Sequence, residues 1–307
     1  MELDVRSIDR LLGEICRLNE EIAVSADEDV AARIKSDLEE IRLALREVLI
    51  AGIKSVQTDV RRCCIYGLSK ICSQEDVYVL IEALNDEDPG VRAWALEGLG
   101  RVADPSRVGA LIQALGDSDS FVYYSAALAL KKLPADVTIR PLLDALRSAD
   151  PTLRKRVVKV LGSMRDARAV DALVSCYYSQ DPSLRYEVIE ALCLIGDRRV
   201  VHTLVAALND EDRDVRIAAL KGLQQLGDES AIAPLVKLAL SSEEERPYAL
   251  EAIMNICGPD AVLPIRRALL EIEAEAERIA EQLVVMMMNR QAFLPLWEWR
   301  NQTLAAN

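Results

Sequence analysis

Apolar residues recur along most of the chain at the three- and four-residue spacing of a helix with one buried face. Within residues 88–115, two such stripes follow each other and are separated by a short polar stretch. The stripes contain Val91, Ala95, Leu96 and Leu99, then Val108, Leu111, Ile112 and Leu115. No stretch keeps the alternation of a strand. The pattern predicts pairs of short helices and an all-α chain.

Polar residues at fixed places predict where these helices begin and end. Asp followed by Pro opens several first helices, because the Asp carboxylate accepts free backbone N–H groups and Pro needs no N–H there. These pairs are Asp88-Pro89, Asp150-Pro151 and Asp181-Pro182. A further Asp precedes the second helix of a pair, and Gly closes some first helices. These residues are Asp104, Asp166, Asp197 and Asp228, with Gly196 and Gly227.

The helix pair recurs every 31 residues. An apolar residue followed by Arg or Tyr marks six copies, at Val60-Arg61, Val91-Arg92, Val122-Tyr123, Leu153-Arg154, Leu184-Arg185 and Val215-Arg216. A leucine keeps the same period at Leu80, Leu111, Leu142, Leu173, Leu204 and Leu235. A fixed period of this size is typical of stacked repeats that contact only their neighbours. We therefore predict a right-handed α-α solenoid.

The Arg of each apolar-Arg pair follows the capping Asp of its helix by four residues. Arg92, for example, follows Asp88. This spacing allows an Asp–Arg contact within one repeat or between stacked repeats. Two interpretations follow: the arginines form a charged binding row, or they form a ladder that caps and stacks the repeats. We favour the ladder.

These residues resemble HEAT repeats, specifically the short HEAT-like kind first described in phycobilisome bilin lyases. The motif Asp-x-x-Val-Arg-x-x-Ala-x-x-x-Leu-Gly, a turn Asp and a second apolar stripe match residues 88–115, 181–208 and 212–240. The copy at 57–84 has Gln57 in place of the capping Asp, and the copy at 243–270 is shifted by one residue. The resemblance implies the solenoid fold. It leaves the function open among lyases, lyase-like chaperones and adaptor proteins.

The ends of the chain lack the repeat. We expect residues 1–52 to form a helical hairpin that caps the array, residues 53–270 to form about seven repeats, and residues 271–307 to form a C-terminal helical cap. The hairpin, with a turn near Ala26-Asp27, could instead be a dimerisation arm. The C-terminal end, which carries Trp297 and Trp299, could instead be a partner-binding tip.

Composition narrows the class of partner. The net charge of −13 disfavours nucleic acid, which needs a positive surface, although a local basic stripe is compatible with an acidic total. Seven cysteines without metal spacing fit a reducing compartment. The acidic start has no apolar run of the signal-peptide type, and the longest apolar run near the end, 283–288, is too short to span a membrane. We therefore expect a cytoplasmic protein.

The sequence gives little evidence for a catalytic motif. His202 is the single histidine, which disfavours a histidine-based zinc site, a Ser-His-Asp triad and the paired His-Glu motifs that resemblance to HEAT-repeat hydroxylases would require. No Walker loop, dinucleotide-binding glycine motif or kinase motif occurs. We assign no catalytic residue and no metal ligand.

The resemblance implies that the second helices line the concave face of the array and form an extended binding surface. The exposed positions that we expect there are Tyr78, Glu82, Gln113, Arg140, Asp144, Arg147, Asp171, Tyr178, His202, Asn209 and Lys237. Their mixed charge suits a polar protein segment or a ligand with carboxylates. The alternative for each residue is a solvated face without a partner.

The third complete repeat departs from the pattern. Tyr123 stands where the others have Arg, and Phe121 and Tyr124 flank it in a chain with few aromatic residues. The three residues form a candidate aromatic interface patch, since such side chains often anchor interfaces. In the alternative, Tyr123 fills the gap left by the missing Asp–Arg pair.

The sequence thus favours a non-catalytic scaffold or adaptor that binds a protein partner along the concave face and needs no cofactor. The alternative is a bilin lyase or a lyase-like chromophore chaperone. In that case Arg140 and Arg147 would hold the propionates of a bilin tetrapyrrole, and Tyr178 would stack on a ring.

Overall fold

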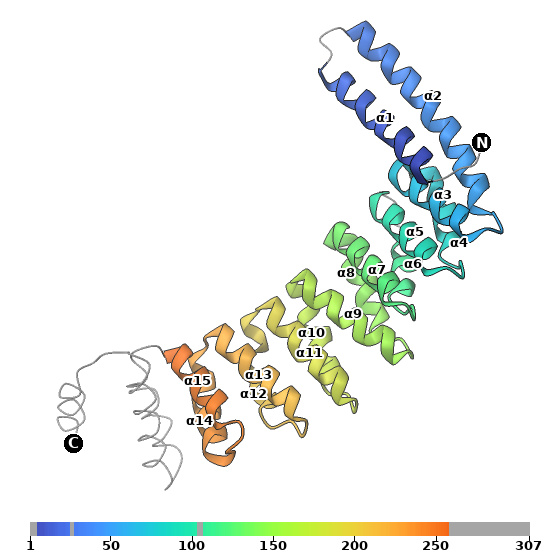
Figure 1. Cartoon of the computed structure of the whole chain (residues 1–307). Helices are drawn as coiled ribbons and strands as arrows, with labels where there is room; N and C mark the ends of the chain where they lie inside the picture. The colour runs from blue at the N-terminus through green and yellow to red at the C-terminus, as the bar shows by residue number, and fades with distance from the viewer. Residues whose placement is uncertain (1–4, 25–27, 103–106, 258–307) are drawn as a thin grey trace, which may run out of the picture. The chain divides into compact units, whose positions relative to one another are not determined.

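The computed structural model describes residues 5–24, 28–102 and 107–257 (Figure 1). Its contacts divide the chain into two compact units, unit 1 over residues 1–164 and unit 2 over residues 165–307. The described residues form fifteen α-helices and four short 3-10 helices, and none of these residues is in a strand. In each unit helical pairs follow one another as stacked repeats, so the predicted all-α solenoid is confirmed.

Unit 1 contains the first nine helices. Their bounds are α1 Val5–Val24, α2 Glu28–Ile53, α3 Thr58–Ile71, α4 Val77–Ala83, α5 Pro89–Arg101, α6 Arg107–Ala114, α7 Ser120–Lys132, α8 Ala135–Ala145 and α9 Pro151–Met164, with the 3-10 helix η1 Gln74–Asp76 before α4. The first helices α3, α5, α7 and α9 alternate with the second helices α4, α6 and α8.

Unit 2 continues the same alternation. Its helices are α10 Val170–Tyr177, α11 Pro182–Ile195, α12 Val201–Ala207, α13 Arg213–Leu226, α14 Ile232–Ser241 and α15 Arg246–Cys257. Short 3-10 helices precede the second helices α10, α12 and α14, at η2 Ala167–Ala169, η3 Arg198–Val200 and η4 Glu229–Ala231.

The predicted capping residues act as expected wherever they are described. In unit 1 the Asp88 carboxylate accepts the backbone N–H of Val91 at 3.0 Å, at the start of α5. In unit 2 Asp212 accepts the N–H groups of Asp214 and Val215 at the start of α13. Gly227 ends α13 with a φ of 65°, the left-handed region that glycine adopts without strain. These residues therefore fix where α5 and α13 begin and where α13 ends.

Leucines at one repeat position form the centre of the core. Leu80, Leu111 and Leu142 in unit 1 are fully buried, as are Leu173, Leu204 and Leu235 in unit 2. Close approach of helices requires a small residue opposite one of them: a Cβ atom on Gly98 of α5 would lie 3.1 Å from the side chain of Leu80. The 31-residue period thus reflects one packing arrangement used repeatedly.

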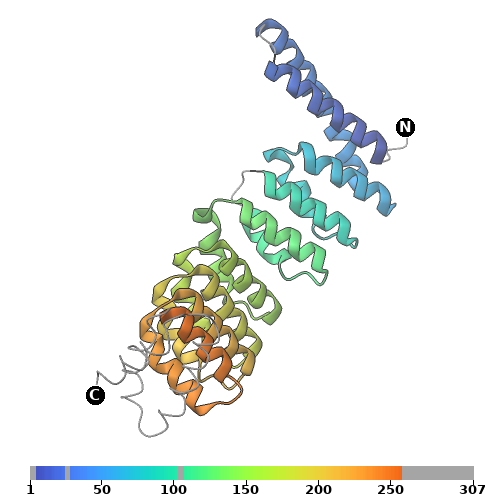
Figure 2. The same cartoon turned by 60° about the vertical axis from the view of Figure 1, so that its left-hand side comes forward.

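The helices α1 and α2 lie side by side as a hairpin at the start of unit 1 (Figures 1 and 2). One end of the hairpin packs on the first repeat, where fully buried Ile8 and Leu49 face Gly67 of α3. A Cβ atom on Gly67 would lie 3.0 Å from both side chains. The roles of this hairpin as a cap or as a dimerisation arm stay predictions.

Several expectations lie outside the described residues. They concern the turn at Ala26-Asp27, the capping Asp104, the second half of the last repeat, the C-terminal cap at 271–307 and the tip with Trp297 and Trp299.

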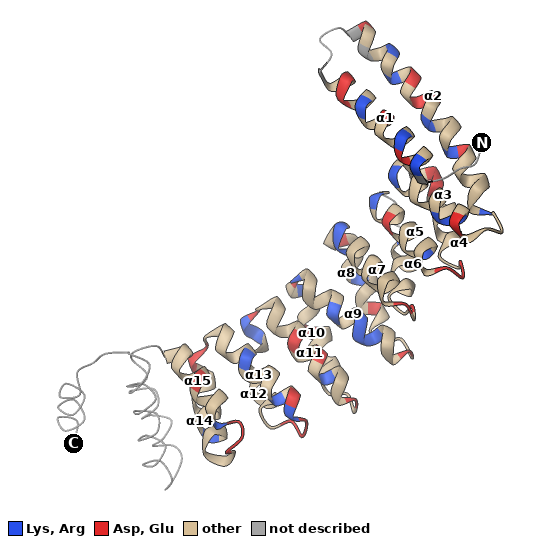
Figure 3. Cartoon of the chain, in the orientation of Figure 1, with Lys and Arg blue, Asp and Glu red and all other residues tan. Residues whose placement is uncertain are grey.

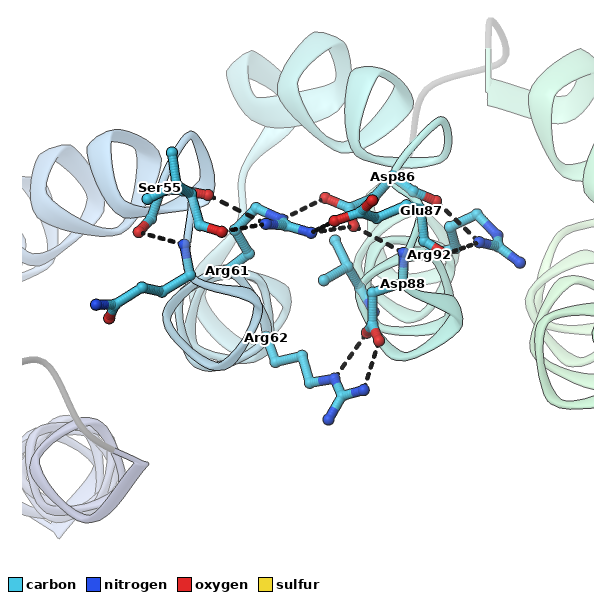
Figure 4. Close-up of polar contacts among 10 residues, drawn as sticks. Ser55, Arg61, Arg62, Asp86, Glu87, Asp88 and Arg92 are labelled. Carbon is cyan, nitrogen blue, oxygen red and sulfur yellow. Dashed lines mark hydrogen bonds and ion pairs between the residues drawn. The ribbon is translucent and has the colours of Figure 1, made fainter.

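Arginines of the first helices form the main polar link between repeats, which we call the Arg–carboxylate ladder. In unit 1, Arg61 donates to both carboxylate oxygens of Asp86, at 2.8 and 3.0 Å. Its third nitrogen donates to the carbonyl oxygens of Ser55 and Val56 (Figure 4). Arg61 therefore ties the loop before its own helix to the loop before the next first helix, using the fixed fork of the guanidinium.

The same geometry recurs along the ladder. Arg92 binds Asp117 through two bonds of 2.8 and 2.9 Å, and Arg185 of unit 2 binds Asp210 through two bonds of 2.8 Å. Arg216 binds Glu245 instead, because the last described repeat is shifted. Each Arg also donates to two carbonyl oxygens five and six residues before it.

The ladder interpretation is therefore confirmed for Arg61, Arg92, Arg185 and Arg216, but not for Arg154, whose buried Nε has no hydrogen-bond partner among the described residues, and the predicted carboxylate partner needs one correction. For Arg61, Arg92 and Arg185, the acceptor is not the capping Asp of either repeat but the Asp two residues before the next cap. That Asp also accepts the backbone N–H of the cap: Asp210 accepts from Asp212 at 2.9 Å. Burial raises the pKa of Asp210, but the hydrogen bonds from Arg185 and Asp212 outweigh it, so the pKa lies below that of an ordinary Asp.

Removing a ladder arginine should destabilise its unit strongly. In Arg185→Ala, the Asp210 carboxylate, 4% exposed, would lose its counterion in a site shielded from water. We expect the free energy of unfolding of unit 2 to fall by about 3 kcal/mol, measured by urea denaturation. Arg168→Ala is the matched control: Arg168 pairs with Asp166 but is 51% exposed, so the loss should stay below about 1 kcal/mol. Equal losses in the two variants would contradict the ladder's structural role.

Asp88 gives the ladder region a defined pH dependence. Its pKa is lowered to about 2, first by hydrogen bonding to Arg62, with a further contribution from the Val91 N–H. Because the folded pKa lies below the unfolded value of about 3.9, this stabilisation is complete above that value and is lost as the pH falls towards 2. Asp88→Asn keeps the helix cap but removes the charge. We expect the difference in urea midpoint between the two proteins to be constant above about pH 5 and to shrink steadily as the pH falls to 2 and below; a difference independent of pH would contradict this assignment.

Candidate binding surfaces

The second helices of unit 1 present exposed side chains opposite their buried stripes. In α4, Val77, Leu80 and Ala83 are buried, so Tyr78 and Glu82 point to solvent, and Tyr78 is 76% exposed. In α6, Gln113 is exposed in the same way. We call these residues, together with Arg140, Asp144 and Arg147 of α8 and its C-terminal turn, the second-helix surface of unit 1.

The α8 part of this surface is a row of three charged side chains. Arg140, Asp144 and Arg147 are spaced by four and three residues and are all exposed, because Thr138, Ile139, Leu142 and Leu146 occupy the buried face. Within the described part of the chain, the side chains of these three residues make no hydrogen bond or ion pair. The ladder arginines differ, because their N–H groups donate to carboxylates and carbonyl oxygens of the neighbouring loops.

In unit 2 the expected residues are also exposed, but some are engaged. Asp171, Tyr178, His202, Asn209 and Lys237 all face solvent, and we call them the second-helix surface of unit 2. Asp171 forms an ion pair with Arg199 at 3.6 Å, and Arg199 also binds Asp197. The ring of Tyr178 lies edge-on to Tyr177, whose hydroxyl donates to Asp210 of the ladder. On this surface, His202, Asn209 and Lys237 are therefore the residues most accessible to a partner.

The expected aromatic patch divides into two parts. Phe121 and Tyr124 are exposed, whereas Tyr123 is half-buried and its ring lies under the guanidinium of Arg156, 4.6 Å from the ring centre. Arg156 also donates to the carbonyl oxygens of Leu115 and Asp117, at 2.6 and 2.5 Å. Arg156 of α9 thus binds the loop that an Arg at position 123 would tie. The alternative interpretation, in which Tyr123 fills the gap in the ladder, matches this packing.

Two features of this region were not predicted from the sequence. Leu128 is exposed on the same helix as Phe121 and Tyr124, and the three-, four- and seven-residue spacings among these residues were visible in the sequence. The partnership of Arg156 with a loop about 40 residues earlier has no local signal, because the repeat period does not predict it.

The described residues bear on two kinds of catalytic group, metal-binding clusters and reactive thiols. No group of three or more His, Cys, Asp or Glu among them could hold a metal ion. Burial raises the pKa of the Cys193 thiol to about 12 and that of the Cys64 thiol to about 11, so both are thiols rather than thiolate nucleophiles at neutral pH. In the same part of the chain, every helix is too short or too polar to traverse a lipid bilayer.

Comparison with known proteins gives a family match. The family model described as HEAT repeats matches residues 77–149, 139–208 and 177–256, which together extend over 77–256. No curated protein sequence matches the chain.

The chain is also similar to several solved structures, of which importin beta supports the fold alone. Importin beta is 13% identical, with a TM-score of 0.51, and the match covers 84% of this chain and 42% of importin beta. Human deoxyhypusine hydroxylase is 20% identical, with a TM-score of 0.36, and the match covers 80% of this chain and 96% of the hydroxylase. The phycocyanin lyase CpcE–CpcF of Nostoc sp. PCC7120 is 20% identical, with a TM-score of 0.35 and coverages of 79% and 94%.

Thiol reactivity tests whether the cysteines are structural. Cys16 is exposed, whereas Cys64 is buried and both Cys64 and Cys193 have raised pKa values. We expect a maleimide at pH 7.5 to label Cys16 of the native protein at least about tenfold faster than Cys64 or Cys193, and to label all three at similar rates in urea. Peptide mapping by mass spectrometry measures these rates. Native labelling of Cys193 as fast as that of Cys16 would mark it as a reactive group and contradict the structural assignment.

Proposed function

Because the chain belongs to the HEAT-repeat family, we propose that it is a non-catalytic scaffold that holds a partner protein along its second-helix surfaces. Arrays of stacked helical pairs present extended surfaces, and such surfaces suit protein segments better than small substrates. The partner chemistry that fits is a polar segment with basic or mixed charge, since the chain carries a net charge of −13.

The main support for this proposal is that the arginines of the first helices are bound within the fold, whereas those of the α8 row are not. In unit 1, Arg61 and Arg92 of the first helices donate hydrogen bonds to carboxylates of the ladder. Arg140 and Arg147 of the α8 row are exposed, and no bond within the described chain fixes them. Exposed arginine and tyrosine side chains are enriched at protein interfaces, which supports the α8 row and Tyr78 as contact residues.

The enzyme alternatives have weaker support. The likeness to CpcE–CpcF and to deoxyhypusine hydroxylase lies below 25% identity and shows the fold alone. The single histidine, His202, also disfavours the hydroxylase chemistry. The bilin-lyase alternative, with Arg140, Arg147 and Tyr178 on a tetrapyrrole, stays a prediction.

Charge reversal on the α8 row tests the proposal. The tagged full chain is used to isolate its partner from cells that express it, and the affinity of that partner is measured for the wild type and for Arg140→Glu/Arg147→Glu. We expect the double variant to bind at least about tenfold more weakly, because carboxylates of a mixed-charge partner would be attracted by the two arginines and repelled by the two glutamates.

The matched control is Lys54→Glu/Lys221→Glu, which changes the net charge equally at exposed positions away from the second helices. This control should bind like the wild type. A change of less than about 0.5 kcal/mol in the α8 variant, within ordinary surface noise, would show that the α8 row does not contact the partner.

A further inference from the structure

The exposed face of α7 carries three large apolar side chains in one row. Phe121, Tyr124 and Leu128 are 58%, 62% and 58% exposed, and their spacing places them on one side of the helix, opposite buried Val122, Ala126 and Ala129. We call these three residues the α7 ridge. Single exposed apolar residues are ordinary, but a contiguous row of them typically marks an interaction site.

The fold itself does not require apolar residues on the α7 ridge. Most of the other first helices carry small, polar or charged residues at two of the three equivalent repeat positions. Phe121 corresponds to Asp59, Gly90, Thr152, Ser183 and Asp214, and Leu128 corresponds to Glu97, Lys159, Glu190 and Lys221, with Tyr66 in α3 as the exception. The position of Tyr124 varies more, with Arg62, Ala93, Lys155, Tyr186 and Ile217. Packing of the array therefore does not explain the α7 ridge.

Basic residues border the α7 ridge in an otherwise acidic chain. Residues 120–164 contain eight Lys or Arg, three Asp and no Glu, a net charge of +5, whereas the whole chain carries −13. Lys131 and Lys132 lie in the last turn of α7 itself. The neighbouring α9 contributes Lys155, Arg156 and Lys159, and Figure 3 shows Lys and Arg gathered on this helix.

One contact joins α9 to α7, and a second contact within α7 continues it to the ridge. The Arg156 guanidinium lies against the ring of Tyr123 of α7, and Tyr123 is in turn in ring contact with Tyr124 of the ridge, at 4.8 Å between ring centres. The positive charge of α9 is thus held next to the apolar row rather than on a separate face of unit 1.

We propose that the α7 ridge docks an acidic segment of another protein that also carries apolar side chains, such as a short amphipathic helix. Its apolar side chains would cover Phe121, Tyr124 and Leu128, and its carboxylates would face Lys131 and Lys132 at the C-terminal end of α7. Apolar anchors supply affinity in such contacts, and the charges supply orientation and exclude other partners.

The distribution of charge favours a peptide over a nucleic acid. The N-terminal end of α7 carries the capping Asp119, and its last turn carries Lys131 and Lys132, so the ridge runs from an acidic end to a basic end. A nucleic acid carries uniform negative charge and would be repelled at one end, whereas a peptide can place its carboxylates at the other end only.

Selection from a random peptide library tests this proposal on the full chain. Sixteen-residue peptides displayed on phage are selected against the immobilised wild type, and the affinities of the enriched peptides are measured by fluorescence polarisation. We expect enriched peptides to combine Asp or Glu with aromatic or aliphatic residues, and to bind more weakly as salt increases. No enrichment, or enrichment of basic peptides, would overturn the proposal.

Variants that borrow residues from other repeats locate the binding site without disturbing the fold. Phe121→Ser/Tyr124→Ala introduces the residues found at the equivalent positions 183 and 93, and Lys131→Glu/Lys132→Glu reverses the charge at the basic end. Each should weaken binding of the enriched peptides at least about tenfold. Circular dichroism melting checks that each variant is folded.

Controls separate this surface from the proposed scaffold surface. Tyr78→Ala removes an equally exposed aromatic side chain of unit 1, and Arg140→Glu/Arg147→Glu alters the α8 row; both should leave peptide affinity unchanged. Peptides that lose affinity in these variants, or that keep it in both α7 variants, would contradict docking on the α7 ridge.

Binding of a nucleic acid and binding of a second copy of the chain to the α7 ridge are tested with the same variants. A labelled single-stranded DNA oligonucleotide that binds the wild type, and loses affinity in Phe121→Ser/Tyr124→Ala, would identify a nucleic-acid site and overturn the proposal. A wild-type dimer in sedimentation that this variant dissociates would assign the α7 ridge to a second copy of the chain, with the same consequence. A monomer that does not bind the oligonucleotide is the expected result.

Discussion

The pairing of an arginine of a first helix with a carboxylate from the following loop, at Arg61, Arg92, Arg185 and Arg216, holds successive repeats together. Leucine packing alone stacks helices but fixes their loops poorly, because loops bury little apolar surface. In unit 1, Arg92 joins two loops with four hydrogen bonds, and Asp117 is held in turn by the backbone N–H of the next cap. Each rung therefore sets the start of the following helix as well as its distance from the preceding one.

This use of arginine determines what the surface can offer. An arginine that gives its donors to buried carboxylates and carbonyl oxygens is not available to a partner. The second helices contribute little to the ladder, so their exposed charges are free to differ from repeat to repeat. The third complete repeat shows the same principle, since Tyr123 takes the ladder position there and Arg156 from the next first helix binds the loop in its place.

Much of the fold follows from the sequence because its signals are local. Asp-Pro pairs, the apolar stripes and the 31-residue period predict helix starts such as Pro89 and Pro151, and the exposure of Tyr78 or Arg140 follows from the opposite buried stripe. The partner of a ladder arginine was harder to predict, because each loop contains more than one acidic residue and only the stacking geometry selects Asp86 or Asp210. Exposure was predictable for the candidate binding residues. Which of these residues bind a partner could not be predicted, because this depends on the structure of the partner as well.

A double-mutant cycle between Arg92 and Asp117 tests most directly whether the ladder couples successive repeats. The free energy of unfolding is measured for Arg92→Ala, Asp117→Ala, the double variant and the wild type. The account predicts a coupling energy of about 1.5 kcal/mol, since each residue loses its main partner when the other is removed. A coupling energy near zero, with the two single losses simply adding, would contradict it.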